Sequence, residues 1–432
     1  MPTTIDEVIE EAASKGIRWA ELEYMDLLGT LRSTMTSLNL LALKKSGSFD
    51  ASSVGLSVIE WSDYTLKPSP DTAIYLDKVV RLLCEIWEPF ESRRSPKDPR
   101  YIVELLEEKL KGEGYRGLIG AELEFMTLDK DLNPISSPAA IPKANYHNAS
   151  PSDPLYNFRL SSVEKLESVG FKVKSFHHEV GVGQSEISTE SKSPLKAADD
   201  VVRIKRLLKE EGQKQGIIVT FMPKPIAHDN GSGMHLHLSL WDDSKNLFYD
   251  PDDEYAELSQ LGRYFIGGLL EHIGSLAALV APTVNSYKRL VPGFEAPVYA
   301  VWGRANRSAA VRVPVYRRGD RSGKRIEFRV PDPSANPYLA FAATFAAGLD
   351  GIKKKIDPGD PYDKNVYVNK PNVKRLPRSL HEALDELESD NSYLQGIMSK
   401  EALETYISLK RDEASRIGSY PSKLEYDSYL LI

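Results

Sequence analysis

Two short segments of the chain carry acidic and imidazole side chains at the spacing of a strand. In G-S-G-M-H-L-H-L-S-L, the residues His235, His237 and Ser239 alternate with apolar residues, directly after a glycine turn. In I-G-A-E-L-E-F, Glu122 and Glu124 alternate with apolar residues in the same way. Because successive side chains of a strand point to opposite faces, we expect each segment to place its polar groups on one face.

Two further segments extend this pattern. In R-I-E-F-R-V, the residues Arg325, Glu327 and Arg329 share one expected strand face. In H-H-E-V-G-V-G-Q-S-E-I, Glu179 and Glu186 have an odd spacing, so they converge only if the glycines turn the chain. One such segment alone would favour a solvated strand face, but their repetition in apolar surroundings favours a site. Buried carboxylates repel one another unless a cation lies between them, and this ligand set suits Mg²⁺ or Mn²⁺.

An arginine-rich stretch lies around the last of these segments. Its members are Arg304, Arg307, Arg312, Arg317, Arg318, Arg321, Arg325 and Arg329. Arginine suits two-pronged recognition of carboxylate or phosphate, and Arg307 and Arg312 lie among apolar residues, which favours them as site residues. Divalent ions beside arginines indicate phosphoryl transfer, although the sequence has no G-x-x-x-x-G-K-[ST] loop. The residues alone therefore predict a metal-dependent enzyme that handles phosphate groups.

The composition sets the class of protein. The chain has 432 residues, which predicts two or three domains, and its net charge of −7 argues against a nucleic-acid partner. No apolar run is long enough to span a membrane, and no signal-peptide pattern opens the sequence. The single cysteine, Cys84, excludes an intrachain disulfide and a thiolate zinc cluster. We expect a cytoplasmic protein whose metals are held by oxygen and imidazole ligands.

The expected elements surround the polar segments. A charged, proline-broken stretch at 91–99 divides the chain into domains at 1–96 and 97–432. Strands are expected at 17–25, 31–35, 73–77, 79–87, 117–128, 171–178, 183–189, 217–222, 233–241 and 324–330. Helices are expected at 3–15, 100–111, 159–169, 195–215, 254–274 and 336–355. Residues 50–70 and 142–158 are expected to be loops.

In their order along the chain, the motifs resemble class I glutamine synthetases. They are F-D-A-S-S (49–53), S-D-Y-T-L-K-P (62–68), G-A-E-L-E-F (120–125), H-H-E-V-G-V-G-Q-S-E-I (177–187), D-N-G-S-G-M-H-L-H-L-S-L (229–240), N-S-Y-K-R-L-V-P-G-F-E-A-P-V (285–298), N-R-S-A-A-V-R-V-P (306–314) and R-I-E-F-R-V-P-D-P-S-A-N-P-Y-L (325–339). The resemblance implies an α+β fold, with an N-terminal β-grasp-like domain and a C-terminal catalytic domain on a curved antiparallel sheet. It also implies a homo-oligomer, a dodecamer of two hexameric rings, with active sites between neighbouring subunits.

The resemblance assigns expected roles to individual residues. The first metal would be bound by Glu124, Glu179 and Glu186, and the second by Glu122, His235 and Glu327. Each active site would hold two or three metal ions in total. The nucleotide would be bound by His237, Ser239, Arg307 and Arg325, and the amino-acid substrate by Gly231, Arg289, Arg312 and Arg329. The ammonium pocket would consist of Asp50 and Asp63, and Glu295 would be the flap residue that covers it.

The implied reaction has two steps and small-molecule substrates. ATP phosphorylates the side-chain carboxylate of glutamate, and ammonia derived from ammonium then displaces phosphate to give glutamine. One alternative is a γ-glutamyl-amine ligase that uses a polyamine or another amine, because Ala51 replaces the family's usual glycine and the loop from Asp50 to Asp63 is slightly shorter. Another is a non-catalytic paralogue, although Glu or His occupies every metal-ligand position. Tyr367 aligns with a tyrosine that some members adenylylate, but its neighbours depart from that site, which favours a structural role.

Overall fold

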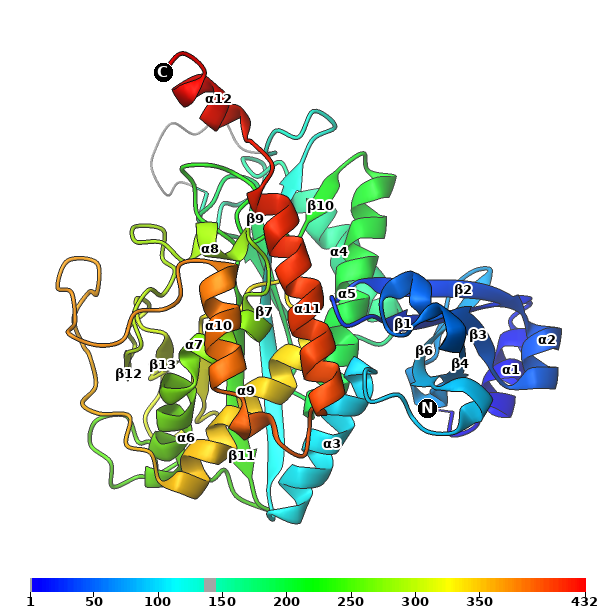
Figure 1. Ribbon diagram of the computed structural model, residues 1–432, viewed down its shortest axis with the longest axis horizontal. Helices are drawn as coiled ribbons and strands as arrows, with labels where there is room; N and C mark the ends of the chain where they lie inside the picture. Colours follow the sequence, from blue (N-terminus) through cyan, green and yellow to red (C-terminus); the bar gives the residue numbers. More distant parts are fainter. Residues whose placement is uncertain (1, 136–144) are drawn as a thin grey trace.

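The computed structural model describes residues 2–135 and 145–432, so residues 142–144 of the expected loop lie outside the described residues. The N-terminal part of the chain forms a small domain that projects from one side of a larger one (Figure 1). Each part has its own sheet, and the two sheets share no strand. An α+β fold with two sheets of this kind confirms the expected fold class.

The N-terminal domain is a mixed sheet with two helices packed against it. Its sheet has the order β2-β1-β6-β4-β3, with β5 paired to β6, and β1 runs parallel to β6. Its strands are β1 (Trp19–Met25), β2 (Leu31–Ser37), β3 (Gly47–Asp50), β4 (Asp63–Pro68), β5 (Ile74–Tyr75) and β6 (Val79–Trp87). Its helices are α1 (Ile5–Ser14) and α2 (Leu38–Lys44), with short 3₁₀ turns η1 (Ser52–Val54), η2 (Ile59–Trp61), η3 (Pro70–Thr72) and η4 (Pro89–Glu91).

The larger domain is built on a sheet of order β12-β13-β14-β11-β7-β9-β8, with β10 paired to β7. Its strands are β7 (Arg116–Leu128), β8 (Val173–His178), β9 (Gln184–Thr189), β10 (Ile218–Thr220), β11 (Met234–Trp241), β12 (Trp302–Arg304), β13 (Val311–Val313) and β14 (Ile326–Phe328). All of its pairs are antiparallel except the parallel pair of β12 and β13.

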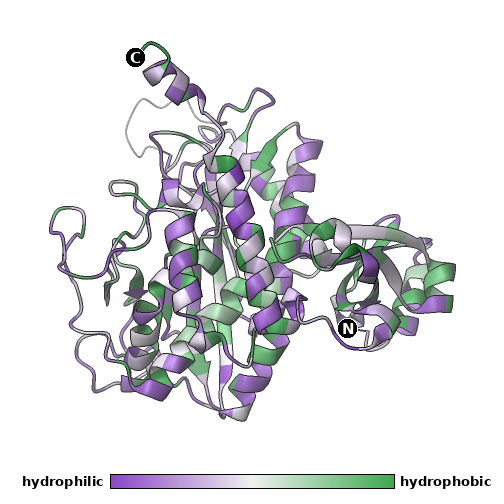
Figure 2. Cartoon of the chain, viewed as in Figure 1, coloured by the Kyte–Doolittle hydropathy of each residue, from purple (hydrophilic) through white to green (hydrophobic). Residues whose placement is uncertain are grey.

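Helices cover one face of this sheet, and α10 and α11 lie nearest the viewer in Figure 1. The helices are α3 (Pro99–Gly112), α4 (Tyr156–Ser168), α5 (Pro194–Lys214), α6 (Gln260–Glu271), α7 (Ile273–Val280), α8 (Ser286–Arg289), α9 (Pro337–Lys354), α10 (Leu380–Ser389), α11 (Lys400–Gly418) and α12 (Lys423–Tyr429), with the 3₁₀ turn η5 (Ser392–Leu394). Hydrophilic and hydrophobic residues alternate along α10 and α11 (Figure 2), as expected for helices that pack on one side and face water on the other.

The apolar side of the alternating strands faces this helical layer. Leu236 and Leu238 of β11 and Phe328 of β14 are fully buried in the main hydrophobic cluster. The period of two then forces the intervening residues, His235, His237 and Glu327 among them, onto the other face. The burial of the apolar face thus fixes the register that assembles the site.

Two expected elements differ from the structure. Residues 63–68, expected as loop, form β4, because Tyr64 and Leu66 alternate into the core against β6. The helix expected at 254–274 starts only at Gln260, because the Asp253 side chain accepts the backbone N–H groups of Ala256 and Leu258 in a turn. Among the described residues, no helix is long and apolar enough to cross a membrane.

Ion pairs tie the N-terminal domain to α5 of the larger domain. Arg81 of β6 forms an ion pair of 2.7 Å with Glu210, and Arg206 forms one of 2.9 Å with Glu21 of β1. Arg206 also contacts the buried carboxylate of Glu23. Because these groups are at least partly buried, the contacts resist screening by salt and hold β1 and β6 in a fixed orientation.

His272, at the junction of α6 and α7, joins three helical segments. Its Nδ1 lies 2.8 Å from the carboxylate of Asp390, and its Nε2 lies 2.9 Å from that of Asp350 on α9. The ring also stacks on Tyr393, and Asp350 pairs with Lys354 at 2.8 Å. Burial alone lowers the pKa of His272, but the hydrogen bonds and charges of the two carboxylates outweigh burial and raise it above 6.5. The imidazolium form therefore stabilises the fold.

We expect His272→Gln to lower the free energy of unfolding by about 2 kcal/mol near pH 6, because hydrogen bonds between charged groups are lost. The wild-type advantage is fully present below the unfolded pKa of 6.5 and disappears as the pH rises through the raised folded pKa. Urea unfolding of both proteins across this pH range measures the difference. His381→Gln, at an exposed position of α10, is the control. A difference independent of pH would contradict the charged state.

Candidate active site

The acidic and imidazole residues meet because they are direct partners across neighbouring strands. His235 of β11 lies opposite Glu122 of β7, and Glu124 of β7 lies opposite Glu186 of β9. Glu327 of β14 lies opposite His237. Directly opposed residues of antiparallel strands have Cβ atoms about 5 Å apart on one face, so the register alone builds the cluster.

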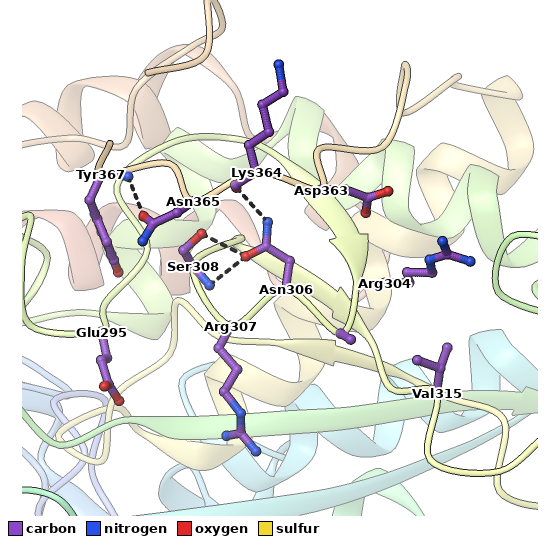
Figure 3. Close-up of a pocket in the computed structure, with 11 residues that line it drawn as sticks. Glu295, Arg304, Asn306, Arg307, Ser308, Val315, Asp363, Lys364, Asn365 and Tyr367 are labelled. Atoms are coloured by element: carbon purple, nitrogen blue, oxygen red, sulfur yellow. Dashed lines mark hydrogen bonds between the residues drawn. The ribbon is translucent and has the colours of Figure 1, made fainter. Parts of the chain in front are cut away.

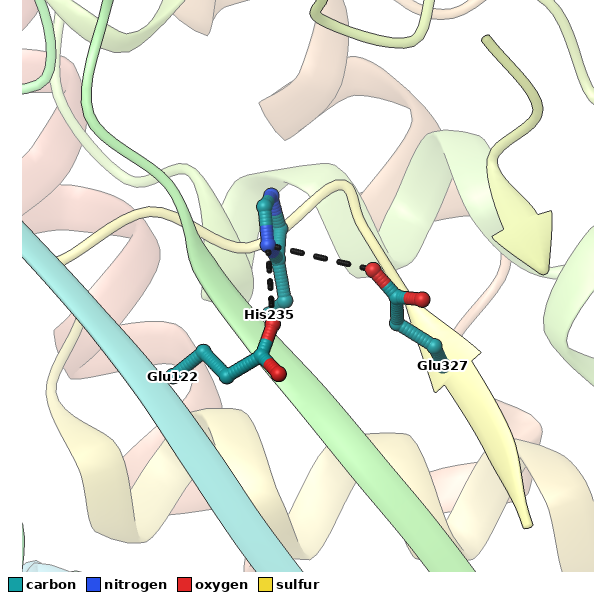
Figure 4. Close-up of side chains that lie close together, drawn as sticks. All are labelled: Glu122, His235 and Glu327. Atoms are coloured by element: carbon teal, nitrogen blue, oxygen red, sulfur yellow. Dashed lines mark ion pairs between the residues drawn. The ribbon is translucent and has the colours of Figure 1, made fainter. Parts of the chain in front are cut away.

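Glu122, His235 and Glu327 form the first of two adjoining groups. Nδ1 of His235 lies 3.5 Å from Glu122 and 3.9 Å from Glu327 (Figure 4). These three residues offer ligand atoms within 4.8 Å of one another. Two carboxylates and an imidazole at this spacing fit the ligand set of one divalent ion.

Glu124, Glu179 and Glu186 line the second group. Nδ1 of His235 lies 3.7 Å from Glu124, and His177 lies 3.3 Å from Glu186 and 3.8 Å from Glu179. Glu179 and Glu186 converge because β8 and β9 form a hairpin across residues 179–183, which confirms the expected glycine turn. Ligand atoms of Glu124, Glu186 and His235 lie within 4.8 Å of one another, as do those of His177, Glu179 and Glu186.

The carboxylates of the second group destabilise one another's charge. Burial and the neighbouring Glu179 and Glu186 raise the pKa of Glu124 well above its ordinary value. Burial and the charge of Glu186 raise the pKa of Glu179 to about 7. Repulsion of this kind is relieved when a divalent cation binds between the carboxylates. The donor set therefore fits a resident metal ion.

Glu327 of the first group has a different environment, because it is compensated by arginines. Arg312 of β13 and Arg329 both form ion pairs with its fully buried carboxylate. Burial alone raises the pKa of Glu327, but the positive charges of Arg329 and the histidines outweigh burial and lower it to about 2. Glu327 therefore stays ionised, and the two guanidinium groups stay fixed beside it.

The glycine turn before β11 allows Arg289 to approach the backbone. A Cβ atom on Gly231 would lie 2.6 Å from the carbonyl oxygen of Pro223, and one on Gly233 would lie 2.7 Å from Nη2 of Arg289. Arg289 is buried and donates to the carbonyls of Val330 at 2.8 Å and Arg329 at 3.0 Å. Among the described residues, its guanidinium forms no ion pair at salt-bridge distance, so its charge is available to an anionic ligand.

His237, Ser239 and Arg325 line a cavity of about 440 Å³ beside the first group. Nε of Arg325 lies 3.0 Å from Nδ1 of His237, whose Nε2 lies 2.8 Å from Glu122. Ser239 accepts a hydrogen bond of 2.9 Å from the Trp241 indole, and both residues line the same cavity. The volume is typical of a small-molecule site, and the expected metal ligand Glu122 is part of the lining.

A second cavity, of about 680 Å³, is lined by Glu295 and Arg307 among others (Figure 3). Arg307 is exposed, which corrects the expectation that it lies in apolar surroundings. It sits in the turn before β13, where the side chain of Asn306 accepts the backbone N–H of Ser308 at 3.0 Å. The apolar residues that follow are buried, but the turn itself projects into solvent.

Asp50 and Asp63 lie opposite each other at the facing ends of β3 and β4 in the N-terminal domain. Both are exposed. Hydrogen bonds from Ser52 and Ser53 lower the pKa of Asp50 to about 2. The two aspartates are therefore cross-strand neighbours in the N-terminal domain, whereas the expected metal-ligand residues all lie in the larger domain.

Family models connect this arrangement to known proteins. The model of the glutamine synthetase catalytic domain matches residues 96–429, and that of the glutamine synthetase β-grasp domain matches residues 16–89. The chain belongs to the glutamine synthetase family. It is thus a member of an enzyme family, and the expected N-terminal β-grasp and C-terminal catalytic domains are confirmed.

Curated relatives match over almost the entire chain. The glutamine synthetase of Sulfolobus acidocaldarius is 43% identical, covering 100% of this chain and 99% of its own. That of Thermotoga maritima is 38% identical, covering 99% of each. Among solved structures, Plasmodium falciparum glutamine synthetase has a TM-score of 0.88 at 28% identity, covering 99% of both chains, and ligand-free GmaS has 0.90 at 30%, covering 100% of both.

Two residues of this glutamine synthetase site were missed from the sequence. His177 lies opposite Glu186 and contacts it. Gln184 donates hydrogen bonds to Glu124 at 3.0 Å and to the carbonyl of Gly231 at 3.1 Å, linking the metal-ligand group to the glycine turn. Both had a detectable signal, because Gln184 and Glu186 share a strand face and His177 lies two residues before Glu179.

Metal binding to the second group should depend on pH. Below about 7, Glu179 carries a proton that a divalent ion must displace, so affinity for Mn²⁺ should rise as the pH increases through this value. Calorimetry in buffers of different ionisation enthalpy would measure the released protons.

Glu179→Gln should weaken binding and reduce the proton release near pH 7, whereas Glu388→Gln, on the remote helix α10, should leave both unchanged. Metal binding without proton release in the unaltered protein would contradict the raised pKa of Glu179.

Proposed function

We propose that this chain is an ATP-dependent glutamate–ammonia ligase that forms glutamine, ADP and phosphate through γ-glutamyl phosphate. The supporting observation is the pair of carboxylate–imidazole groups near a nucleotide-sized cavity, together with the buried Arg289, which forms no ion pair at salt-bridge distance among the described residues. Full-length similarity to curated glutamine synthetases supports the same activity. Because every expected metal ligand is present, a non-catalytic role does not explain the site.

The two groups would hold Mg²⁺ or Mn²⁺, with Glu122, His235 and Glu327 on one side and Glu124, Glu179 and Glu186 on the other. Bound divalent ions supply neutralisation of the phosphate charge during transfer. The protein's own contribution is to fix the ligands, since each lies on a strand of one sheet or in the turn between two of them. Fixed ligands reduce the reorganisation needed in the transition state.

The nucleotide would occupy the cavity beside His237. Ser239 and Trp241 line this cavity and would contact the base, and His237 and Arg325, which lie beside Glu122, would bind phosphate oxygens. Arg307 projects towards the adjacent cavity and would bind the transferring phosphate. The terminal phosphate would then lie next to the metal-ligand groups, where bound divalent ions would neutralise its charge.

Glutamate would be held by Arg289, Arg312 and Arg329, with the backbone at Gly231 beside Arg289. An oxygen of the glutamate side-chain carboxylate attacks the γ-phosphorus, and the bond to the β-phosphate oxygen breaks to release ADP. The nitrogen of ammonia then attacks the acyl carbon, a proton leaves the nitrogen, and phosphate departs. Glu295 would cover the intermediate against water, which competes with ammonia.

Asp50 and Asp63 would bind ammonium at the site of a neighbouring copy. Asp50 remains ionised because its hydrogen bonds lower its pKa to about 2, and a charged carboxylate favours a cation. Both residues are exposed in the single chain, so a neighbouring copy can contact them. We propose a dodecamer of two stacked hexameric rings in the cytoplasm, in which neighbouring subunits complete one another's sites.

The C-terminal segment supports assembly. Residues 420–432 project from the body of the chain (Figure 1), and Leu424, Leu430, Leu431 and Ile432 are each at least 70% exposed. Exposure of apolar side chains on a projecting segment to water is unfavourable unless another surface covers them. A second copy of the chain provides that surface in the proposed assembly.

The proposed reaction is tested by measuring glutamine and phosphate with glutamate, ATP and either ammonium or a panel of amines that includes polyamines. Ammonium should give equal amounts of glutamine and phosphate, and Glu327→Ala should be inactive because it removes a metal ligand and leaves Arg312 and Arg329 uncompensated. Product with amines only would replace the proposal by a γ-glutamyl-amine ligase. Absence of product with every acceptor would overturn both.

Truncation after Ser419 should reduce the molar mass of the assembly, because it removes the exposed apolar segment. Light scattering coupled to size-exclusion chromatography measures the change. Leu43→Ser, at an exposed leucine of α2 in the N-terminal domain, is the control and should assemble normally. An unchanged molar mass after truncation would show that the segment does not hold copies together.

A further inference from the structure

The segment V-P-G-F-E-A-P, which contains Glu295, has a strained backbone. Gly293 has φ of 98°, and Glu295 has φ of 58°, in the left-handed region that non-glycine residues avoid. A left-handed conformation is unfavourable at a residue with a Cβ, so surrounding contacts must hold it. The segment is therefore a loop whose conformation depends on its attachments.

Two contacts attach this segment to other parts of the chain. Nζ of Lys224 lies 3.6 Å from the ring centroid of Phe294, and the hydroxyl of Tyr367 donates a hydrogen bond of 2.7 Å to the carbonyl of Ala296. Ala296 is buried and directly follows Glu295. Figure 3 shows the Tyr367 side chain extending from its loop towards Glu295.

Tyr367 belongs to a small hydrophobic cluster that is separate from the main core. Its buried members are Val298, Val301, Ala309 and Val366, with Tyr299, Tyr362 and Tyr367 packed against them. These residues come from the strand-like base of the Glu295 segment, the turn that carries Arg307 and the loop at 362–367. The cluster thus joins three pieces of chain that line one cavity.

Hydrogen bonds fix the same three pieces. The side-chain amide of Asn306 donates to the carbonyl of Tyr362 at 2.6 Å, and the backbone N–H of Val366 donates to Ser308 Oγ at 3.2 Å. The loop at 362–367 is therefore anchored to the Arg307 turn. Only then does the Tyr367 hydroxyl reach across to the Glu295 segment.

We propose that Tyr367 is a positioning residue that holds the Glu295 segment closed while γ-glutamyl phosphate is present. The inference rests on the proposed function, because it assigns Tyr367 to protection of that intermediate. The hydroxyl acts through Ala296 and touches no reacting atom. Loss of its hydrogen bond increases the open fraction of the segment and admits water to the acyl phosphate.

The test is Tyr367→Phe, which retains the ring in the cluster and removes only the hydroxyl. A single hydrogen bond changes an opening equilibrium by about threefold to tenfold, so phosphate release without ammonium should rise by a similar factor. The ratio of glutamine to phosphate should fall below one with ammonium present, and the KM for ATP should stay unchanged. Hydrogen exchange at the amides of residues 293–296 should be faster.

Tyr362→Phe is the matched control, because the Tyr362 hydroxyl bonds only the carbonyl of Asn369, within its own loop, among the described contacts. It should keep the wild-type ratio and exchange rates. An unchanged ratio and unchanged exchange in Tyr367→Phe, or equal uncoupling in both variants, would overturn the proposal. Failure of the wild type to form glutamine would instead refute the proposed function, so the two failures are distinguishable.

Discussion

The convergence of buried carboxylates on one face of the catalytic sheet is the constraint on which the rest of the site depends. The carboxylates cannot move apart, because cross-strand register holds Glu124 opposite Glu186, and burial of Leu236 and Leu238 fixes that register. Their repulsion must therefore be compensated by positive charge. The chain itself supplies this compensation for Glu327, through Arg312 and Arg329. Glu124 has no comparable ion pair with an arginine or lysine among the described residues, so compensation there must come from a bound cation.

This difference gives the two metal groups distinct properties. A carboxylate already paired with arginines remains ionised and rigid whether or not a cation is bound. A group held together against its own repulsion takes up protons when the cation leaves, as the raised pKa of Glu179 indicates. The geometry of Arg312 and Arg329 is therefore set by the protein, whereas the geometry around Glu124 and Glu179 depends on the ion. Arg312 and Arg329 are therefore suited to bind a substrate carboxylate whether or not a metal ion is present.

Several parts of the fold and site could be predicted from the sequence, because they depend on local periodicity. The alternation through His235 and His237 defines a strand and its inner face without knowledge of its partners. The turn between Glu179 and Glu186 follows from their odd spacing and the intervening glycines. Contacts between residues far apart in the chain could not be predicted, since the hydrogen bond from Tyr367 to Ala296, for example, depends on tertiary packing. The exposure of Arg307 was also misjudged, because the apolar residues that follow it belong to β13.

The metal-ligand candidates lie mainly on strands, whereas the residues expected to admit substrates and exclude water lie on loops or strand ends. This arrangement follows from two requirements of the proposed chemistry. Phosphoryl transfer needs ligands fixed in place, and nearly all the metal-ligand candidates lie on paired strands of one sheet. Admission of substrates and exclusion of water need parts that open and close, and Glu295 lies on a strained loop while Asp50 lies at the exposed end of β3. A strained loop closes reliably only when something fixed holds it. The small cluster around Val298 and Val366 provides that fixed point, because it anchors the loop to the arginine turn rather than to the metal ligands. The Glu295 loop can then open and close without disturbing the strand register that positions the metal ligands.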